Sequence, residues 1–160
     1  MSVRDVLLWP DPRLSEVCAP VEAPDAQLID DLFDTMYAAN GRGLAAPQIG
    51  VLRRIFVVDV SWKEGPRDPR VFVNPALQSR CEDMRSMEEG CLSIPDLPMT
   101  VTRPEGVTLS WDGPNGLLEE AFTGILARCI QHELDHLDGR VIFDHQSPDD
   151  RAELEAAYAR

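Results

Sequence analysis

Residues 131–136, near the end of the chain, read QHELDH and contain the pattern HExxH. Residues four apart lie on one face of an α-helix, so a helix here directs the imidazoles of His132 and His136 at one ion. The pattern from 123 to 137 is helical, and an Asp-Gly pair follows it as a stop signal. Taken alone, the motif is also compatible with a helix whose Glu133 is simply solvated. A catalytic metal requires a third protein ligand and an open position.

Two residues are candidates for that third ligand. His145 lies beyond the helix with no motif around it, and we interpret it as an ordinary polar surface residue. Cys91 follows Gly90 and precedes Pro95, which indicates a constrained backbone segment rather than a regular core strand. A lone cysteine is usually a small buried hydrophobe. The residues alone therefore favour Cys91 without excluding a packing role.

Composition restricts the classes of function. A formal charge of -13 repels phosphate backbones, so DNA binding over a broad basic face is not expected. No apolar run approaches the ~20 residues of a membrane span, and residues 1–13 do not resemble a signal peptide. The four cysteines are scattered, which argues against a disulfide framework. We expect one cytoplasmic domain spanning 1–160, with no membrane contact.

The first long periodic segment predicts a helix. Asp25 can cap it, Leu28, Leu32 and Met36 recur every four residues, and it ends near Asn40. We interpret this stripe as core.

Residues 54–60 and 71–73 are rich in β-branched and aromatic side chains and predict strands, separated by a surface loop. Residues 107–111 and 117–122 flank a turn sequence and predict a hairpin whose register stays open. Ser147 can cap a final helix. The side chains expected to face the core from that helix are Leu154, Ala157 and Tyr158.

Three segments in this order closely resemble the motifs of the peptide deformylases: GRGLAAPQ at 41–48, EGCLS at 89–93 and QHExDH at 131–136. The resemblance implies an α+β fold with antiparallel β-sheets packed around the central HExxH helix. It also implies that Cys91, His132 and His136 bind the metal. Fe2+ is the implied ion, one per chain, with Zn2+, Ni2+ or Co2+ able to substitute, since one thiolate and two imidazoles suit all of them.

The implied reaction removes the formyl group from the N-terminal formyl-methionine of newly synthesised peptides and releases formate. As in other HExxH enzymes, Glu133 is expected to take a proton from water and deliver it to the amine. By the resemblance, the side-chain amide of Gln48 and the backbone N–H of Leu92 face the developing oxyanion. Without the other motifs, the favoured interpretation of Gln48 is a turn residue after Pro47.

The resemblance also implies how a peptide is bound. Backbone groups around Gly43, Leu44 and Gly90 are expected to pair with it as with an added strand. The methionine pocket is then expected to be formed by four side chains: Leu44, Met87, Ile125 and Cys129. Core packing is the competing interpretation, because Ile125 and Cys129 share a helical stripe with the first metal histidine.

This sequence departs from the family pattern at two places. Arg128 stands where an apolar residue is more frequent near the substrate side chain, so it is expected to narrow or charge the pocket. Residues 96–99 lack an arginine that many relatives carry shortly after the segment CLSIP, which is residues 91–95 here. Arg103 remains and can pair with Glu89.

Two other functions stay open. One is a deformylase-like protein that binds peptides or the ribosome with weak or altered activity; the other is an HExxH peptidase that cuts internal bonds. The intact Glu133 and Gln48 argue against the first, and the motif that contains Cys91 fits the second poorly. The expected partners are N-formylmethionyl nascent peptides, with transient ribosome association left open, and the chain is expected to be a monomer.

Overall fold

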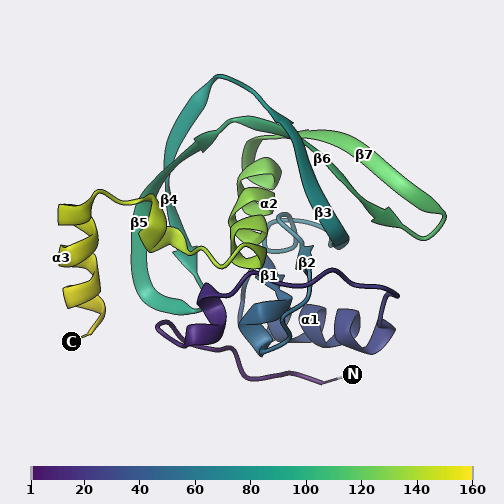
Figure 1. The fold of residues 1–160 in the computed structure, drawn as a ribbon, viewed down its shortest axis with the longest axis horizontal. Helices are drawn as coiled ribbons and strands as arrows, with labels where there is room; N and C mark the ends of the chain where they lie inside the picture. Colours follow the sequence, from purple (N-terminus) through teal and green to yellow (C-terminus); the bar gives the residue numbers. More distant parts are fainter. Residues whose placement is uncertain (1, 160) are drawn as a thin grey trace.

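Helix α2 (Gly124–Leu137) lies in the middle of the molecule, between two β-sheets (Figure 1). The computed structural model describes residues 2–159. The other helices are α1 (Ala26–Ala38) and α3 (Pro148–Tyr158), with short 3-10 turns at Pro12–Ser15, Ala46–Ile49 and Ile142–His145. The strands are β1 (Gly43–Ala45), β2 (Ile55–Val58), β3 (Arg70–Arg80), β4 (Met84–Cys91), β5 (Ile94–Pro104), β6 (Gly106–Gly113) and β7 (Gly116–Thr123).

Both sheets are antiparallel. The larger has the strand order β1-β2-β3-β6-β7, and the smaller consists of β4 and β5 alone. Figure 1 shows the β4–β5 hairpin on one side of α2 and the β3, β6 and β7 strands on the other. The predicted α+β architecture around the HExxH helix is thus confirmed. Among the described residues, no helix has both the length and the apolar character that crossing a bilayer requires.

Helix α1 forms as its sequence predicts. The Asp25 carboxylate accepts hydrogen bonds from the N–H groups of Gln27 and Leu28, which satisfies donors that the first turn leaves unpaired. The predicted stripe is buried in a core cluster that also contains Ile55 and Val57 of β2. Strand β1 follows α1 in the chain, and the segment between them leads from this core cluster to the centre of the molecule.

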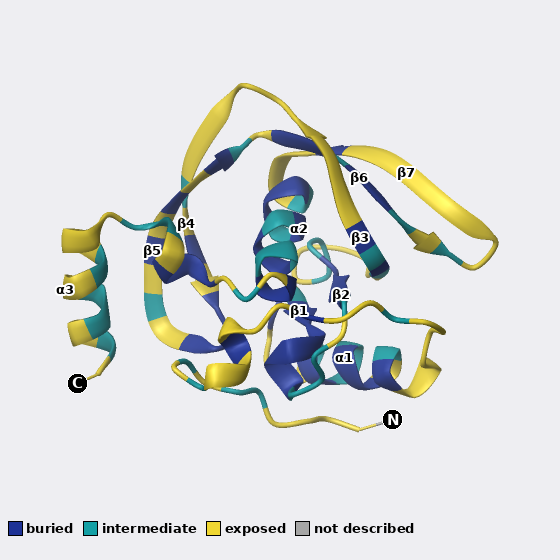
Figure 2. Cartoon of the chain, in the orientation of Figure 1, coloured by how far each residue is buried: buried dark blue, intermediate teal, exposed yellow. Residues whose placement is uncertain are grey.

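Helix α2 is apolar on the side that faces the large sheet. Ala127, Ile130 and Leu137 pack in a cluster with Phe56 and Phe122 of that sheet, and Figure 2 shows the helix as a mixture of buried and intermediate residues. The helix ends at a glycine with φ of 74°, as its sequence predicts. A Cβ at that glycine would lie 2.7 Å from a backbone oxygen of the N-terminal segment.

One local prediction holds only in part, and one is wrong. Cys91 is the last residue of strand β4, but the pairing of this strand is irregular between Glu89 and Cys91. The cap of α3 is as predicted, since the Ser147 hydroxyl accepts from a backbone N–H, and Leu154 and Tyr158 pack against the core. Ala157, however, is exposed, because α3 contacts β5 with only one narrow face (Figure 2).

The hairpin is present over a wider range than predicted, with Gly113 paired to Gly116 at its turn and Val107 paired to Phe122. The strand predicted at 71–73 extends to Arg80.

Candidate active site

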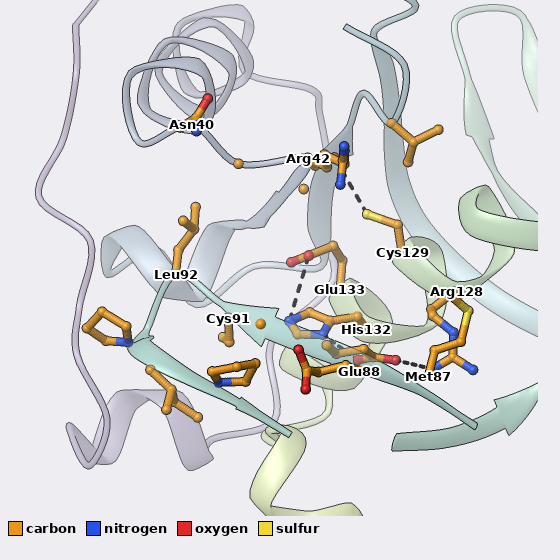
Figure 3. Close-up of a pocket in the computed structure, with 18 of the residues that line it drawn as sticks. Asn40, Arg42, Met87, Glu88, Cys91, Leu92, Arg128, Cys129, His132 and Glu133 are labelled. Atoms are coloured by element: carbon orange, nitrogen blue, oxygen red, sulfur yellow. Dashed lines mark hydrogen bonds and ion pairs between the residues drawn. The ribbon is translucent and has the colours of Figure 1, made fainter. Parts of the chain in front are cut away.

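Three buried side chains from two elements converge beside α2. Cys91 comes from the end of β4, and His132 and His136 come from successive turns of α2. One potential ligand atom from each lies within 4.8 Å of the other two. The Cys91 Sγ atom is 3.5 Å from His136 Nε2. Figure 3 shows Cys91 beside His132. The structure therefore brings together the three ligands that the sequence predicts.

The electrostatics of this cluster fit a cation. Burial alone would raise the pKa of the Cys91 thiol, but His136 and His132 lower it to about 5, which favours the thiolate. Burial likewise opposes protonation of His132, yet Glu133, Cys91 and Glu89 raise its pKa well above the ordinary value. The surroundings thus stabilise positive charge between these groups. A thiolate with two imidazoles is a donor set for a soft or borderline divalent metal.

Glu89 orients the first histidine. Its carboxylate lies 2.9 Å from His132 Nδ1, which leaves Nε2 directed at the cluster. The same carboxylate accepts hydrogen bonds from Arg103 at 2.7 and 3.0 Å and from Arg128. Burial would raise the pKa of Glu89, but the histidine and the arginine lower it well below the ordinary value. The pairing of Arg103 with Glu89 is as expected from the sequence.

A further layer lies behind Arg103. Its guanidinium donates to Asp135 at 2.9 Å, and Asp135 also lies 2.7 Å from the Nε2 atom of His145. The His145 side chain is only 19% exposed, so its interpretation as an ordinary surface residue is wrong. Sequence reasoning missed this contact because His145 is separated from Asp135 by the end of α2 and a turn, and no motif surrounds it.

Glu133 lies next to the ligand cluster with an unusual environment. Its Oε2 atom is 4.0 Å from His132 Nε2, and its Oε1 atom is buried with no hydrogen-bond partner in the described part of the chain. Burial raises the pKa of this carboxyl group, while the two histidines act against that shift. A buried carboxylate oxygen without a hydrogen-bond partner lowers the stability of the folded protein. Such a group is typical of a site that handles a proton.

Gly43 explains how the carboxylate of Glu133 fits there. A Cβ on Gly43 would lie 2.6 Å from Glu133 Oε2 and 2.8 Å from the Cys129 Sγ atom. Only glycine therefore allows β1 to pass this close to α2.

Gln48 and Leu92 lie next to Cys91. The Gln48 Oε1 atom accepts from the Ala45 N–H at 3.0 Å, and its Nε2 atom lies 3.0 Å from Ser93 Oγ and 3.8 Å from Cys91 Sγ. The amide is thus fixed with its donor end toward the ligand cluster. Leu92 occupies the turn between β4 and β5, and both residues line the cleft.

The cluster opens into a cleft of about 600 Å³. Strand β1 pairs only with β2, and β4 pairs only with β5, so each has one edge without a strand partner. Gly43 from β1 and Gly90 from β4 both line the cleft. A cleft between two open strand edges can hold an extended chain through backbone hydrogen bonds.

Four of the expected substrate side chains line this cleft: Met87, Ile125, Arg128 and Cys129. Leu44 does not, and its expected place in the pocket is wrong. Its side chain is 0% exposed and packs into the core under α1. Side chains alternate between the two faces of a strand, so the residue beside the cleft-lining Gly43 points away from the cleft.

Two basic residues in the cleft were missed from the sequence. Arg42 and Lys63 both line it, and Arg42 pairs with Glu64 at 2.6 Å. Lys63 belongs to the loop before β3. A hydrogen bond from the indole N–H of Trp62 to the carbonyl oxygen of Gly41 holds this loop beside Gly41. The segment without an arginine, residues 96–98, lines the opposite part of the cleft. Apart from Arg128 of α2, positive charge in the cleft is therefore supplied from the β1 side.

An α+β fold with an HExxH helix, a cysteine beside it and a cleft for an extended chain defines a metal-dependent hydrolase. The family model for polypeptide deformylase matches residues 3–152. The chain belongs to this polypeptide deformylase family.

Individual relatives agree over almost the whole chain. The peptide deformylase of Pseudomonas aeruginosa is 46% identical over 151 residues, which cover 92% of this chain and 89% of that protein. The crystal structure of a peptide deformylase from Legionella pneumophila has a TM-score of 0.89 and 41% identity, covering 99% of this chain and 94% of that one. The Ehrlichia chaffeensis peptide deformylase in complex with actinonin has a TM-score of 0.90 and 35% identity, covering 98% and 96%. Nothing in these matches favours the non-catalytic alternative.

Proposed function

We propose that this chain hydrolyses the formyl group from the N-terminal formyl-methionine of newly synthesised peptides and releases formate. The observation that carries the proposal is the buried carboxylate of Glu133, whose Oε1 atom has no hydrogen-bond partner among the described residues, beside the cluster of Cys91, His132 and His136 in a cleft with two open strand edges. Membership of the polypeptide deformylase family names the bond that such a site cleaves.

The proposed cofactor is one Fe2+ ion held by Cys91, His132 and His136, with Zn2+, Ni2+ or Co2+ as substitutes. When bound, the ion lowers the pKa of water and polarises the formyl carbonyl. A sulfur donor among the ligands supports a borderline or soft ion over magnesium or calcium. Metal analysis of protein purified without oxygen tests this choice, and calcium or magnesium as the retained ion would contradict it.

Glu133 is proposed as the base that takes a proton from water and then as the acid that delivers it to the departing amine. Its proximity to His132 and its buried position support this role. The Gln48 amide and the Leu92 N–H are proposed to donate to the oxyanion that forms on the formyl group. This role is supported by the distance of 3.8 Å between Gln48 Nε2 and Cys91 Sγ, by the place of Leu92 directly after Cys91, and by both residues lining the cleft.

The peptide backbone is proposed to lie between the edges of β1 and β4, where Gly43 and Gly90 keep the walls free of side chains. The methionine side chain then enters the apolar part of the cleft formed by Met87, Ile125 and Cys129. Backbone recognition suits an enzyme that must accept many sequences after the first residue.

The proposed partners are nascent formyl-peptides, and the proposed location is therefore the cytoplasm, where translation supplies them. We propose a monomer that meets the ribosome only transiently, because a net charge of -13 opposes stable contact with ribosomal RNA. Sedimentation of the chain with ribosomes at low and physiological salt tests this, and salt-resistant co-sedimentation would contradict it.

The first test is formate release from a short formyl-methionyl peptide, with anaerobically prepared protein loaded with Fe2+ or Ni2+. Rapid metal-dependent release supports the proposal. No release from folded, fully metallated protein would reject it. An unformylated peptide in the same assay distinguishes deformylation from cleavage of internal bonds.

Gln48→Glu is expected to lower kcat by roughly 10²- to 10³-fold, because the carboxylate keeps an acceptor for the Ala45 N–H but loses the donor proposed for the oxyanion. KM is expected to change little. The matched control is Gln78→Glu, since Gln78 also donates to a serine hydroxyl, Ser110, far from the cleft. Equal kcat in wild type and Gln48→Glu, at equal metal content, would remove Gln48 from the mechanism.

Gly43→Ala is expected to lower kcat/KM by about 10²-fold or more, since a small misplacement of a catalytic group can cost that much. The added Cβ would lie 2.6 Å from Glu133 Oε2 and must displace the carboxylate. Gly65→Ala is the control, because its Cβ would meet only a backbone oxygen at 3.8 Å. The check is kinetics with metal content measured in parallel; wild-type rates for Gly43→Ala would show that the carboxylate position is not critical.

A further inference from the structure

A second, smaller cavity adjoins the cleft. It has a volume of about 150 Å³, and Met87, Ile125 and Arg128 line both hollows. Figure 3 shows Arg128 beside Met87 at this end of the cleft. A side chain that lies along Met87 and Ile125 in the cleft is therefore next to the guanidinium of Arg128.

The Arg128 guanidinium has N–H donors that no acceptor among the described residues uses. Arginine carries five N–H donors. One terminal nitrogen, NH1, donates to Glu89 and to the Val101 carbonyl oxygen at 3.0 Å, and the other, NH2, donates to the Arg85 carbonyl oxygen at 2.6 Å. The Nε–H has no acceptor among the described residues, and the atom is not one of those sealed away from solvent. One hydrogen on NH2 is also left over.

These contacts fix the position of Arg128 as well. All three of its acceptors lie on the β4–β5 hairpin, so the side chain cannot move aside without losing them. The pocket for the first side chain is thus apolar along Met87 and Ile125 but has a fixed, charged hydrogen-bond donor, Arg128, beside these two residues.

We propose that Arg128 allows this site to deformylate peptides whose first side chain ends in a neutral hydrogen-bond acceptor, with N-terminal formyl-methionine sulfoxide as the main further substrate. The proposal rests on the proposed function. The bond cleaved and the products are the same, since water still adds across the formyl C–N bond and the sulfoxide is unchanged. Formyl-glutamine belongs to the same class. Its amide oxygen is bonded to the δ carbon, which has the same place along the side chain as the δ sulfur of methionine sulfoxide.

The physical reason is desolvation. A sulfoxide oxygen or an amide that enters an apolar pocket without a partner loses its hydrogen bonds to water, which opposes binding. A charged donor held in place restores one strong hydrogen bond. The thioether of unoxidised methionine is only a weak acceptor, so it neither needs this donor nor is rejected by it. Carboxylate tips are expected to be disfavoured, because Glu89 and Glu105 lie at the same end.

The test compares wild type with Arg128→Met on formyl-X-Ala-Ser peptides in which X is methionine, norleucine, methionine sulfoxide, glutamine or glutamate. The measured quantity is the ratio of kcat/KM for the sulfoxide peptide to that for the norleucine peptide. Metal occupancy and the folded fraction cancel within one preparation. The ratio is expected to fall by roughly tenfold to a hundredfold in Arg128→Met, as loss of a hydrogen bond to a charged donor predicts. Arg151→Met, which removes an arginine of α3 that pairs with Asp144 and Glu155, is expected to leave it unchanged.

An unchanged ratio in Arg128→Met would overturn the proposal, as would a wild-type ratio below about one hundredth. If Arg128→Met has no activity at all, inhibition of wild type by the unformylated products decides. Methionine sulfoxide-Ala-Ser is then expected to inhibit at least as strongly as norleucine-Ala-Ser, and weaker inhibition by more than tenfold would reject the idea. Failure of the proposed function has a different signature, since wild type would then release no formate from the formyl-methionyl peptide either.

Discussion

Glu133→Ala is expected to lower kcat for a formyl-methionyl peptide by about 10²- to 10⁴-fold, the usual contribution of a positioned acid or base. The variant is expected to keep its metal, because Cys91, His132 and His136 are unchanged. It is also expected to keep its fold, since the Glu133 Oε1 atom has no hydrogen-bond partner in the described chain to lose. The measurements are the rate of formate release and the metal content of the same preparation.

Glu155→Ala on α3 is the matched control, since it removes a glutamate far from the cleft that pairs only with Arg151. Normal turnover in Glu133→Ala with full metal content would exclude the proton-transfer role. Loss of metal from that variant would instead assign Glu133 to holding the ligand cluster together, which the separation of 4.0 Å from His132 Nε2 argues against.

The helices and two of the three candidate metal ligands were predictable from the sequence because they depend on local rules. Apolar residues four apart identify α1, and the HExxH spacing identifies α2 together with two candidate ligands. The third candidate ligand required the resemblance of the motif around Cys91 to the deformylases. Its residue type alone left a buried hydrophobe open, and the structure shows Cys91 buried as well as convergent with the histidines.

Strand β4 was not predictable, because its buried face is not apolar. The residues that face α2 are Met87, Glu89 and Cys91, and the middle one is a glutamate that is buried only because arginines from two other elements reach it. Sequence alternation therefore shows no hydrophobic face. The buried charge becomes understandable only when residues 14 and 39 positions away along the chain are brought to it.

The sequence also did not predict which side chains beside the cleft point into it. The motif GRGLAAPQ places β1 at the site, but it does not tell which residues point inward. The structure gives Gly43 to the cleft and Leu44 to the core, since the strand edge and not the larger side chain faces the open space. The contact between His145 and Asp135 depends in the same way on how the chain turns after α2.

Glu89→Ala is expected to reduce the free energy of unfolding by about 3–5 kcal/mol, the usual cost of removing one partner from a buried ion pair. Glu89 is 7% exposed and Arg103 is 3% exposed, so the Arg103 guanidinium cannot regain water when the carboxylate is removed. The measurement is urea unfolding at neutral pH, where a lower midpoint with an unchanged slope reports stability. Glu120→Ala is the control, because its contact with Arg70 at 3.7 Å is exposed and contributes about 0–1 kcal/mol.

The same variant has a pH signature that separates charge pairing from simple packing. The folded chain lowers the pKa of Glu89 below its ordinary value of 4.5, so the stabilisation is fully present above that value. It is lost as pH falls toward the lower pKa of the folded state, because the unfolded chain then binds the proton first. The stability difference between wild type and Glu89→Ala is therefore expected to shrink on acidification below that pH. A difference that stays constant with pH would mean that Glu89 acts through volume, and that the arginines around it do not depend on its charge.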